Sequence, residues 1–281
     1  FASNLVTGDV INFIQILGNV LDLGVPSDNT VTLAKLASGT DGNLISYDAS
    51  GNPVAVATGN DGQVLTSTGA GSPPVFETAV ASGLTSTQVF TSSGTWNRPS
   101  GITKVRVYVT GGGGGGGGAT GGTYNFQVGS SGGAGGTAIE FIDVSSTTSA
   151  TVTIGAGGTV GSEAAGGTGG TSSFASFCSA SGGTGGVRPG AFNNASPGGI
   201  GSGGDLNLRG QGGGGAMENA GGAMNPVAGG NSFWGGGAGG QWSANGVAGE
   251  TGGGGTAGNG NNAARSGGLG GSGLVYVEEY K

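Results

Sequence analysis

The chain has 281 residues, of which 73 are glycine, 8% are charged and none is histidine, and its formal net charge is -7. The missing histidine excludes Ser-His-Asp and Cys-His catalysis, and the single cysteine excludes an intrachain disulfide and a four-cysteine zinc site. The eight basic residues are scattered, so no basic stripe predicts binding to nucleic acid. No apolar run reaches the roughly 18 residues that a membrane span needs, so we expect no membrane insertion. Because the chain opens on Phe1 rather than Met, we expect a fragment of a longer product.

The most apolar segment of the chain is residues 9–23, within a first region of residues 1–38. Val10, Ile14, Leu17 and Leu21 keep a 4-3-4 spacing, which is typical of a short helix entering a coiled coil. The Ile, Val and Phe of the segment also favour a strand, so both alternatives stay open. Either element is too apolar to be bare on a monomer, and we expect self-association here.

Residues 39–84 contain two copies of a 20-residue repeat, in which residues 41–46 recur as residues 61–66. Asp-Gly favours a turn and the apolar pair after it favours a strand, so each copy is expected to be a turn-strand-turn-strand unit. Asp41 and Asp61 are then turn residues rather than metal ligands. Two copies are too few for a stable solenoid, and parallel copies of the same chain would supply the missing partner.

Glycine is concentrated in residues 111–273, which hold 60 of the 73 glycines against 13 in residues 1–110. Composition alone favours disorder, and the Gly-X-Y period of collagen is not kept. The flanks argue for order, because residues 103–110 alternate strictly between apolar and polar and residues 273–280 are rich in β formers. The last strand can be buried only if the chain returns to its partner. We therefore expect an insertion that begins and ends at one sheet.

Two further strands are predicted at residues 137–144 and 150–154, the first with Ile139, Phe141 and Asp143 on one face. The glycine insertion, mainly residues 155–272, is expected to form polyproline-II-type helices that pack backbone to backbone. Its non-glycine segments would be the loops where these helices reverse, gathered at the ends of the bundle: residues 172–181, 192–197, 205–209, 216–220, 231–234 and 241–245. The predicted fold class is all-β, a small antiparallel β-sandwich carrying an insertion of polyglycine-II helices.

Residues 89–107, followed by the octaglycine at residues 111–118, resemble the opening of the glycine-rich tip domain of bacteriophage tail fibres and distal-tip adhesins. The same pattern is matched by residues 132–138, 151–158, 169–174 and 273–280, and the Asp-Gly repeats with residues 70–76 look like phage fibre stem repeats. The resemblance covers residues 39–281. It implies an apolar trimerising stem segment (1–38), stem repeats (39–84) and a tip domain (85–281).

The resemblance further implies a homotrimeric fibre at the distal end of a virion tail, joined to other phage tail proteins upstream of residue 1. The tip would bind a bacterial surface protein or polysaccharide through loops at the far end of a layered polyglycine-II lattice. In the adhesins of T-even-like phages the glycine domain is a separate chain, whereas here it follows stem repeats in one chain. This difference favours three tip domains per fibre over a single cap.

Because glycine carries no side chain, receptor contacts are expected from the loops. Phe233, Trp234 and Trp242 are the main candidates, since Trp is a frequent hot-spot residue and stacks on sugars. The alternative is that these rings cap the lattice or pack on a neighbouring chain. The other receptor-binding candidates are Met217 and Met224, for which filling a local gap is the alternative, and Phe192, Asn193, Tyr124 and Phe126. Core positions are expected for Trp96, Phe174, Phe177 and Cys178.

We expect no enzymatic activity, no cofactor and no metal. Glycan cleavage needs paired carboxylates, and the six acidic residues of residues 111–273 form no obvious pair. Glu278 and Glu279 are adjacent on a strand, so they should point to opposite faces. The glycine patterns lack the Gly-Lys-Ser/Thr of a P-loop. Two alternatives stay open: a purely structural or ice-binding glycine-helix protein, and a tailspike that depolymerises glycans.

Overall fold

The computed structural model describes residues 7–8, 38–79, 82–121, 127–188, 195–215, 227–260 and 263–281. The chain divides into two compact units, Phe1–Val80 and Ala81–Lys281. Among the described residues the regular elements are β-strands and the sheets are antiparallel, so the predicted all-β class is confirmed. Within these residues no helix has the length and apolar character needed to cross a membrane.

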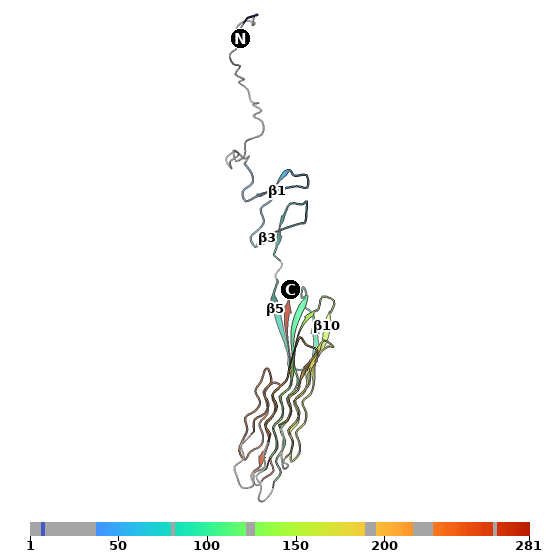
Figure 1. Cartoon of the computed structure of the whole chain (residues 1–281), viewed down its shortest axis with the longest axis vertical. Helices are drawn as coiled ribbons and strands as arrows, with labels where there is room; N and C mark the ends of the chain where they lie inside the picture. The colour runs from blue at the N-terminus through green and yellow to red at the C-terminus, as the bar shows by residue number, and fades with distance from the viewer. Residues whose placement is uncertain are drawn as a thin grey trace. The chain divides into compact units, whose positions relative to one another are not determined.

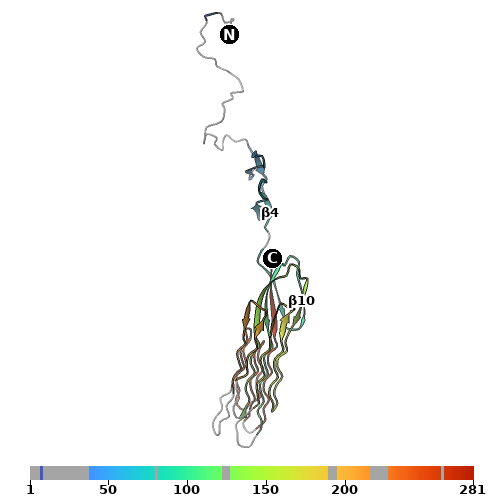
Figure 2. The same cartoon turned by 45° about the vertical axis from the view of Figure 1, so that its right-hand side comes forward.

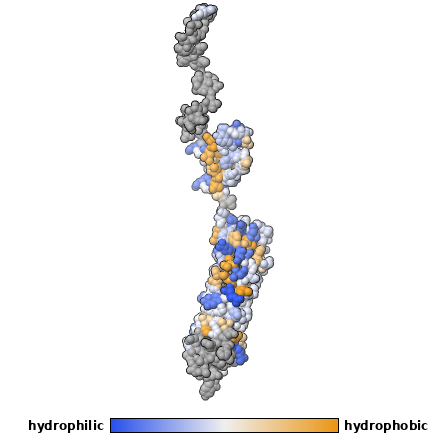
Figure 3. Space-filling model, in the orientation of Figure 1, coloured by the Kyte–Doolittle hydropathy of each residue, from blue (hydrophilic) through white to orange (hydrophobic). Residues whose placement is uncertain are grey.

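The first unit contains two hairpins, one from each copy of the repeat. β1 (Leu44–Tyr47) pairs with β2 (Pro53–Val56), and β3 (Gln63–Thr66) pairs with β4 (Val75–Thr78). The expected pair of strands in each copy is confirmed. Several apolar side chains of these strands remain exposed, with Ile45 at 66% and Leu65 at 47%, and an orange strip marks apolar residues along this unit in Figure 3.

The second unit begins with a β-sandwich, drawn as the arrows around β5 and β10 in Figure 1. One sheet has the strand order β14-β9-β7-β16-β5 and the other the order β13-β12-β11-β10-β6. The bounds are β5 Leu84–Phe90, β6 Gly94–Asn97, β7 Lys104–Thr110, β9 Thr137–Asp143, β10 Ser149–Thr153, β11 Ser172–Phe174, β12 Cys178–Ala180, β13 Gly201–Ser202, β14 Leu206–Leu208 and β16 Leu274–Tyr280. The predicted strands at residues 103–110, 137–144, 150–154 and 273–280 are therefore present, each within one residue of its expected bounds.

The sandwich core lies between the two sheets. Trp96 and Phe174 are fully buried in it, with ring centroids 5.7 Å apart, and the buried faces of β7 and β16 pack against them. Cys178 is also buried, and desolvation raises the pKa of its thiol to about 12, so this residue is a core side chain rather than a nucleophile. The core positions expected for Trp96, Phe174 and Cys178 are confirmed, and Phe177 packs against the core while partly buried.

The sequence predicts which side chains share a face on β16 and on β9, and the structure tests both predictions. Glu278 and Glu279 do point to opposite faces, and the buried Glu279 carboxylate accepts hydrogen bonds from Trp96 Nε1 and Gln88 Nε2, both at 2.7 Å. Ser86 Oγ donates a third bond to the same carboxylate, so the buried group is well satisfied. On β9, residues Ile139, Phe141 and Asp143 share a face, but it is the outer one, because Ala138 and Ile142 fill the core side.

The strands that flank the glycine region are neighbours. β7 and β16 pair antiparallel from Thr110↔Leu274 to Lys104↔Tyr280. The chain therefore leaves the sheet after Thr110 and returns to the adjacent position at Leu274, which confirms an insertion anchored at both ends. Figures 1 and 2 show the insertion as extended segments lying side by side, continuing from one end of the sandwich.

The octaglycine at residues 111–118 is the central helix of this lattice. Its amides donate in a three-residue cycle to three antiparallel segments, as Gly114 to Gly133, Gly115 to Gly167 and Gly116 to Gly268. Its carbonyls accept with the same period from three parallel segments. The six neighbours are residues 129–136, 164–170 and 265–271, which accept, and residues 155–161, 182–187 and 252–258, which donate. A three-residue period with hydrogen bonds only between neighbouring helices, and none within a helix, is the geometry of polyglycine II.

The lattice differs from the sequence-based expectation in two respects. It already includes residues 111–119 and 129–136, which precede the expected main part at residues 155–272. In addition, residues 172–181 and 205–209 are not bare reversal loops. The first forms the β11–β12 hairpin with alternating buried side chains, and the second contains β14, which pairs with β9. Both segments extend the sandwich because their side chains fill its sheets.

Candidate functional site

Side chains are excluded from the inside of the lattice. A Cβ added to any glycine of residues 111–118 would lie 1.8 to 2.4 Å from a carbonyl oxygen of a neighbouring segment, closer than any real contact. Outer segments instead follow a Gly-Gly-X pattern in which the third residue faces solvent, as at Thr168, Thr184 and Leu269. The lattice therefore confines possible ligand contacts to its surface rows and its two ends.

Phe233 and Trp234 lie at the sandwich end of the lattice. The Trp234 ring contacts Tyr108 of β7 and Tyr276 of β16, with centroids 5.7 Å away in both cases, and the Phe233 ring lies 4.9 Å from Trp234. Ser232 Oγ fixes the turn by accepting from the Gly235 amide at 2.9 Å and donating to the Thr251 carbonyl at 2.6 Å. Both rings thus pack where the lattice meets the sheet, although 49% of Phe233 and 41% of Trp234 stay exposed.

Trp242 lies at the opposite end of the lattice, called here the far end, where the octaglycine finishes. The Gly117 carbonyl accepts from the Gly258 amide, and the next residue, Asn259, donates to the Ala244 carbonyl two residues after Trp242. Residues 235–240 separate the two aromatic turns by roughly 19 Å at the rise of polyglycine II. Trp242 is 53% exposed and forms no ring contact within the described residues. The three aromatic candidates are therefore not one cluster.

The other six candidates for receptor contact lie outside the described residues: Met217, Met224, Phe192, Asn193, Tyr124 and Phe126. Among the residues that are described, no group of three or more Cys, Asp and Glu side chains is close enough to hold a metal ion.

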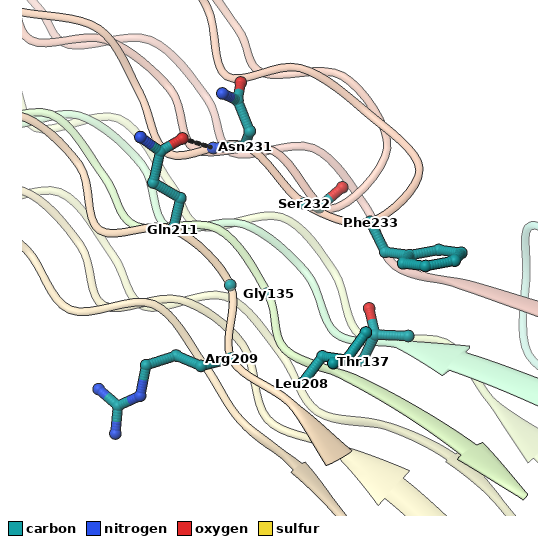
Figure 4. Close-up of a pocket in the computed structure, with 9 residues that line it drawn as sticks. Gly135, Thr137, Leu208, Arg209, Gln211, Asn231, Ser232 and Phe233 are labelled. Carbon is teal, nitrogen blue, oxygen red and sulfur yellow. Dashed lines mark hydrogen bonds between the residues drawn. The ribbon is translucent and has the colours of Figure 1, made fainter. Parts of the chain in front are cut away.

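Sequence reasoning missed a groove at the junction of lattice and sandwich. Its volume is about 330 Å³, and Phe233 forms part of its wall (Figure 4). Three polar residues from two lattice segments, Arg209 and Gln211 from one and Asn231 from the other, also line it. They are 22 residues apart in the chain from first to last, and only the side-by-side packing of residues 209–214 and 227–231 brings them together. The sequence pattern of these segments gave no signal for this, because neighbours in the lattice are set by the path of the chain.

Comparison of the sequence with known protein families shows that residues 85–280 match the glycine-rich domain family. The match begins within β5 and finishes at the last residue of β16, so it spans the sandwich and the whole lattice together. Since it covers most of the chain, the protein belongs to the glycine-rich domain family. No curated protein matches the sequence significantly.

Proposed function

We propose that this protein is the receptor-binding tip of a bacteriophage tail fibre, which attaches the virion to a protein or polysaccharide of the bacterial surface. The observation that carries the proposal is the exposed indole of Trp242 at the far end of the lattice. A lattice held by main-chain bonds presents this ring on an ordered main chain, and a tryptophan has only two side-chain torsions to restrict on binding, so it binds at a low cost in conformational entropy. The resemblance of the sequence to phage tip domains is the second support.

In this proposal the chain acts as a homotrimer, attached through its first unit to other tail proteins of the virion. The support is the exposure of apolar strand residues in that unit, including Tyr47 at 64% and Val64 at 49%. Two-stranded sheets are marginal in water without a third partner. Parallel copies of the same hairpins would cover these side chains and complete the missing core.

The attachment proposal is tested by binding of the labelled full-length protein to a panel of bacterial strains. We expect Trp242→Ala to weaken binding to a strain that the parent protein recognises by at least about tenfold, as for a hot-spot aromatic residue. The matched control is Leu269→Ala, which removes an equally exposed apolar side chain from the side of the lattice. Binding to no strain, or equal binding by both variants, would contradict the proposal.

We also propose that the tip binds without cleaving. Glu279 is sequestered in the core by three hydrogen-bond donors, and Glu278 lies on the opposite face at 3.5 Å from Arg106, so these neighbours cannot act as a carboxylate pair. Incubation with polysaccharide from a recognised strain should leave the number of reducing ends unchanged. An increase in reducing ends would show a glycan depolymerase instead.

A further inference from the structure

Strand β5 enters the sandwich at the end that is remote from the lattice. Its first residue, Leu84, lies opposite Tyr280 at the end of β16, and its last residue, Phe90, lies opposite Val275 next to the lattice. Figures 1 and 2 show the C-terminus, which follows β16, at the sandwich end away from the lattice. The chain therefore joins the first unit to one end of β5, and it joins the lattice to the opposite end of β16, through Gly273.

A pull between the first unit and the far end of the lattice loads β5 and β16 in opposite directions. The chain draws β5 from Leu84, away from the lattice, while the lattice draws β16 from Leu274. Because the strands are antiparallel, each is drawn by its N-terminal end, and β5 must slide along β16 before it can leave the sheet. Within the described residues β5 pairs with β16 alone, so this one strand pair opposes the sliding.

Sliding resists force better than peeling does. A slide of about 3.4 Å, the rise of one residue, breaks the register of all six residue pairs between β5 and β16 at once. Peeling from one end breaks a single pair at a time, and each broken pair frees one residue from each strand, about 7 Å of chain. The work of rupture is delivered over a much shorter distance in sliding, so sliding requires a higher force.

A buried carboxylate reinforces the same pair of strands. Glu279 of β16 accepts hydrogen bonds from two side chains of β5, Gln88 Nε2 at 2.7 Å and Ser86 Oγ, and from Trp96 Nε1 of β6, also at 2.7 Å. Hydrogen bonds to an ionised group are about twice as strong as neutral ones. Two of these three bonds cross the interface along which β5 would slide.

The other neighbour of β16 is loaded differently. β7 pairs with β16 along its whole length, and both strands continue into the lattice at the same end, from Thr110 and Leu274. A pull from the lattice moves these two strands together. The ion pair between them, Arg106–Glu278 at 3.5 Å, therefore bears no sliding load.

We propose that the β5–β16 pair is a mechanical clamp, which keeps the second unit folded under tension between residue 83 and the far end of the lattice. The main-chain bonds between Gly83 and Lys281, at 3.2 and 3.4 Å, extend the clamp by one residue pair. Bearing a tensile load is a function separate from ligand binding. The inference rests on the proposed function only for the source of the tension, a virion that pulls on an attached cell.

The test is force spectroscopy on single molecules of the full chain, pulled in two directions. One handle is attached at Ser82→Cys in both cases. The second is attached either at Glu163→Cys or at the C-terminus. Glu163 is exposed and lies at the far end, since the next residue, Ala164, accepts from the amide of Gly118. Cys178 is buried and does not compete for the handles.

Pulling from Ser82 and Glu163 makes β5 slide along β16, whereas pulling from Ser82 and the C-terminus peels the strands apart from their shared end. We expect the sliding direction to need at least about twice the rupture force, because it ruptures the pair over the shorter distance.

Two substitutions locate the load. Gln88→Ala removes a donor of β5 from Glu279 and should speed rupture in the sliding direction at constant force by about tenfold, as for loss of a hydrogen bond to a charged group. The matched control, Arg106→Gln, breaks the ion pair between β7 and β16 and should leave this rate unchanged.

Equal rupture forces in the two directions, or equal effects of the two variants, would overturn the inference. Attachment of the same chain to bacteria is measured in parallel. If the chain attaches but both directions rupture at equal force, the inference fails and the proposed function stands. If sliding needs the higher force and no strain is bound, the clamp stands and the proposed function fails.

Discussion

Gly116 lies in the middle of the central helix of the lattice, where a Cβ would be 1.8 Å from the Thr256 carbonyl oxygen. The main chain at Gly116 cannot move away easily, because Gly116 also donates a hydrogen bond to Gly268 and accepts one from Gly161. We expect Gly116→Ala to lower the free energy of unfolding by about 3 kcal/mol or more, at or above the upper end of overpacking penalties in ordinary cores. Urea denaturation followed by circular dichroism measures this loss.

Gly239 is the matched control for that substitution. It lies in an outer segment, and a Cβ there would meet no atom within 4 Å. We expect Gly239→Ala to be neutral or to stabilise by up to about 1 kcal/mol, since alanine restricts the unfolded chain. Equal losses at Gly116 and Gly239 would mean that glycine is needed for flexibility rather than for close packing, contrary to the proposed basis of the lattice.

At the scale of elements, β16 joins the sandwich and the lattice. It pairs with β7 on one side and β5 on the other, and it follows directly on the lattice residue Gly273. Truncation after Gly273 would leave β5 without its partner in the sheet and β7 paired with β9 alone, and it would remove Val275 and Val277 from the core. We expect the shortened chain to lose cooperative thermal unfolding, which calorimetry detects. Removal of residues 1–80 instead should leave the transition of the second unit in place, since they belong to a separate unit. An unchanged transition after the β16 truncation would contradict its anchoring role.

The elements that could be predicted from sequence are those with a strict pattern. β7 alternates Val with polar residues over seven positions, and β16 continues to the end of the chain, so their pairing followed from the need to bury both. The strands β11, β12 and β14 have three residues each, which is too short for periodicity to appear among glycines. The sequence predicts Phe233 and Trp234 as receptor contacts, and that stays a prediction. Their position at the sandwich end depends on contacts with Tyr108 and Tyr276, residues remote in sequence, and could not be read from the loop itself.

At the scale of the whole molecule, the first unit has exposed apolar strands while the second has its own core. If the first unit trimerises, the full chain should sediment as a trimer and a chain beginning at Ala81 as a monomer. Analytical ultracentrifugation distinguishes these states. A monomeric full chain, or a trimer that persists without residues 1–80, would contradict the assignment of trimerisation to the first unit.

The account depends most on the claim that the glycine region is ordered by its main chain, against the disorder that its composition favours. Each amide of residues 111–118 donates to a carbonyl of a neighbouring segment, at distances of 2.8 to 3.0 Å. Hydrogen–deuterium exchange across these residues tests the claim most directly, because bonded amides exchange only when the structure opens. We expect protection comparable to that of β7. Complete exchange of residues 111–118 at the shortest labelling time, with β7 and β16 still protected, would show a disordered insertion on a folded sandwich.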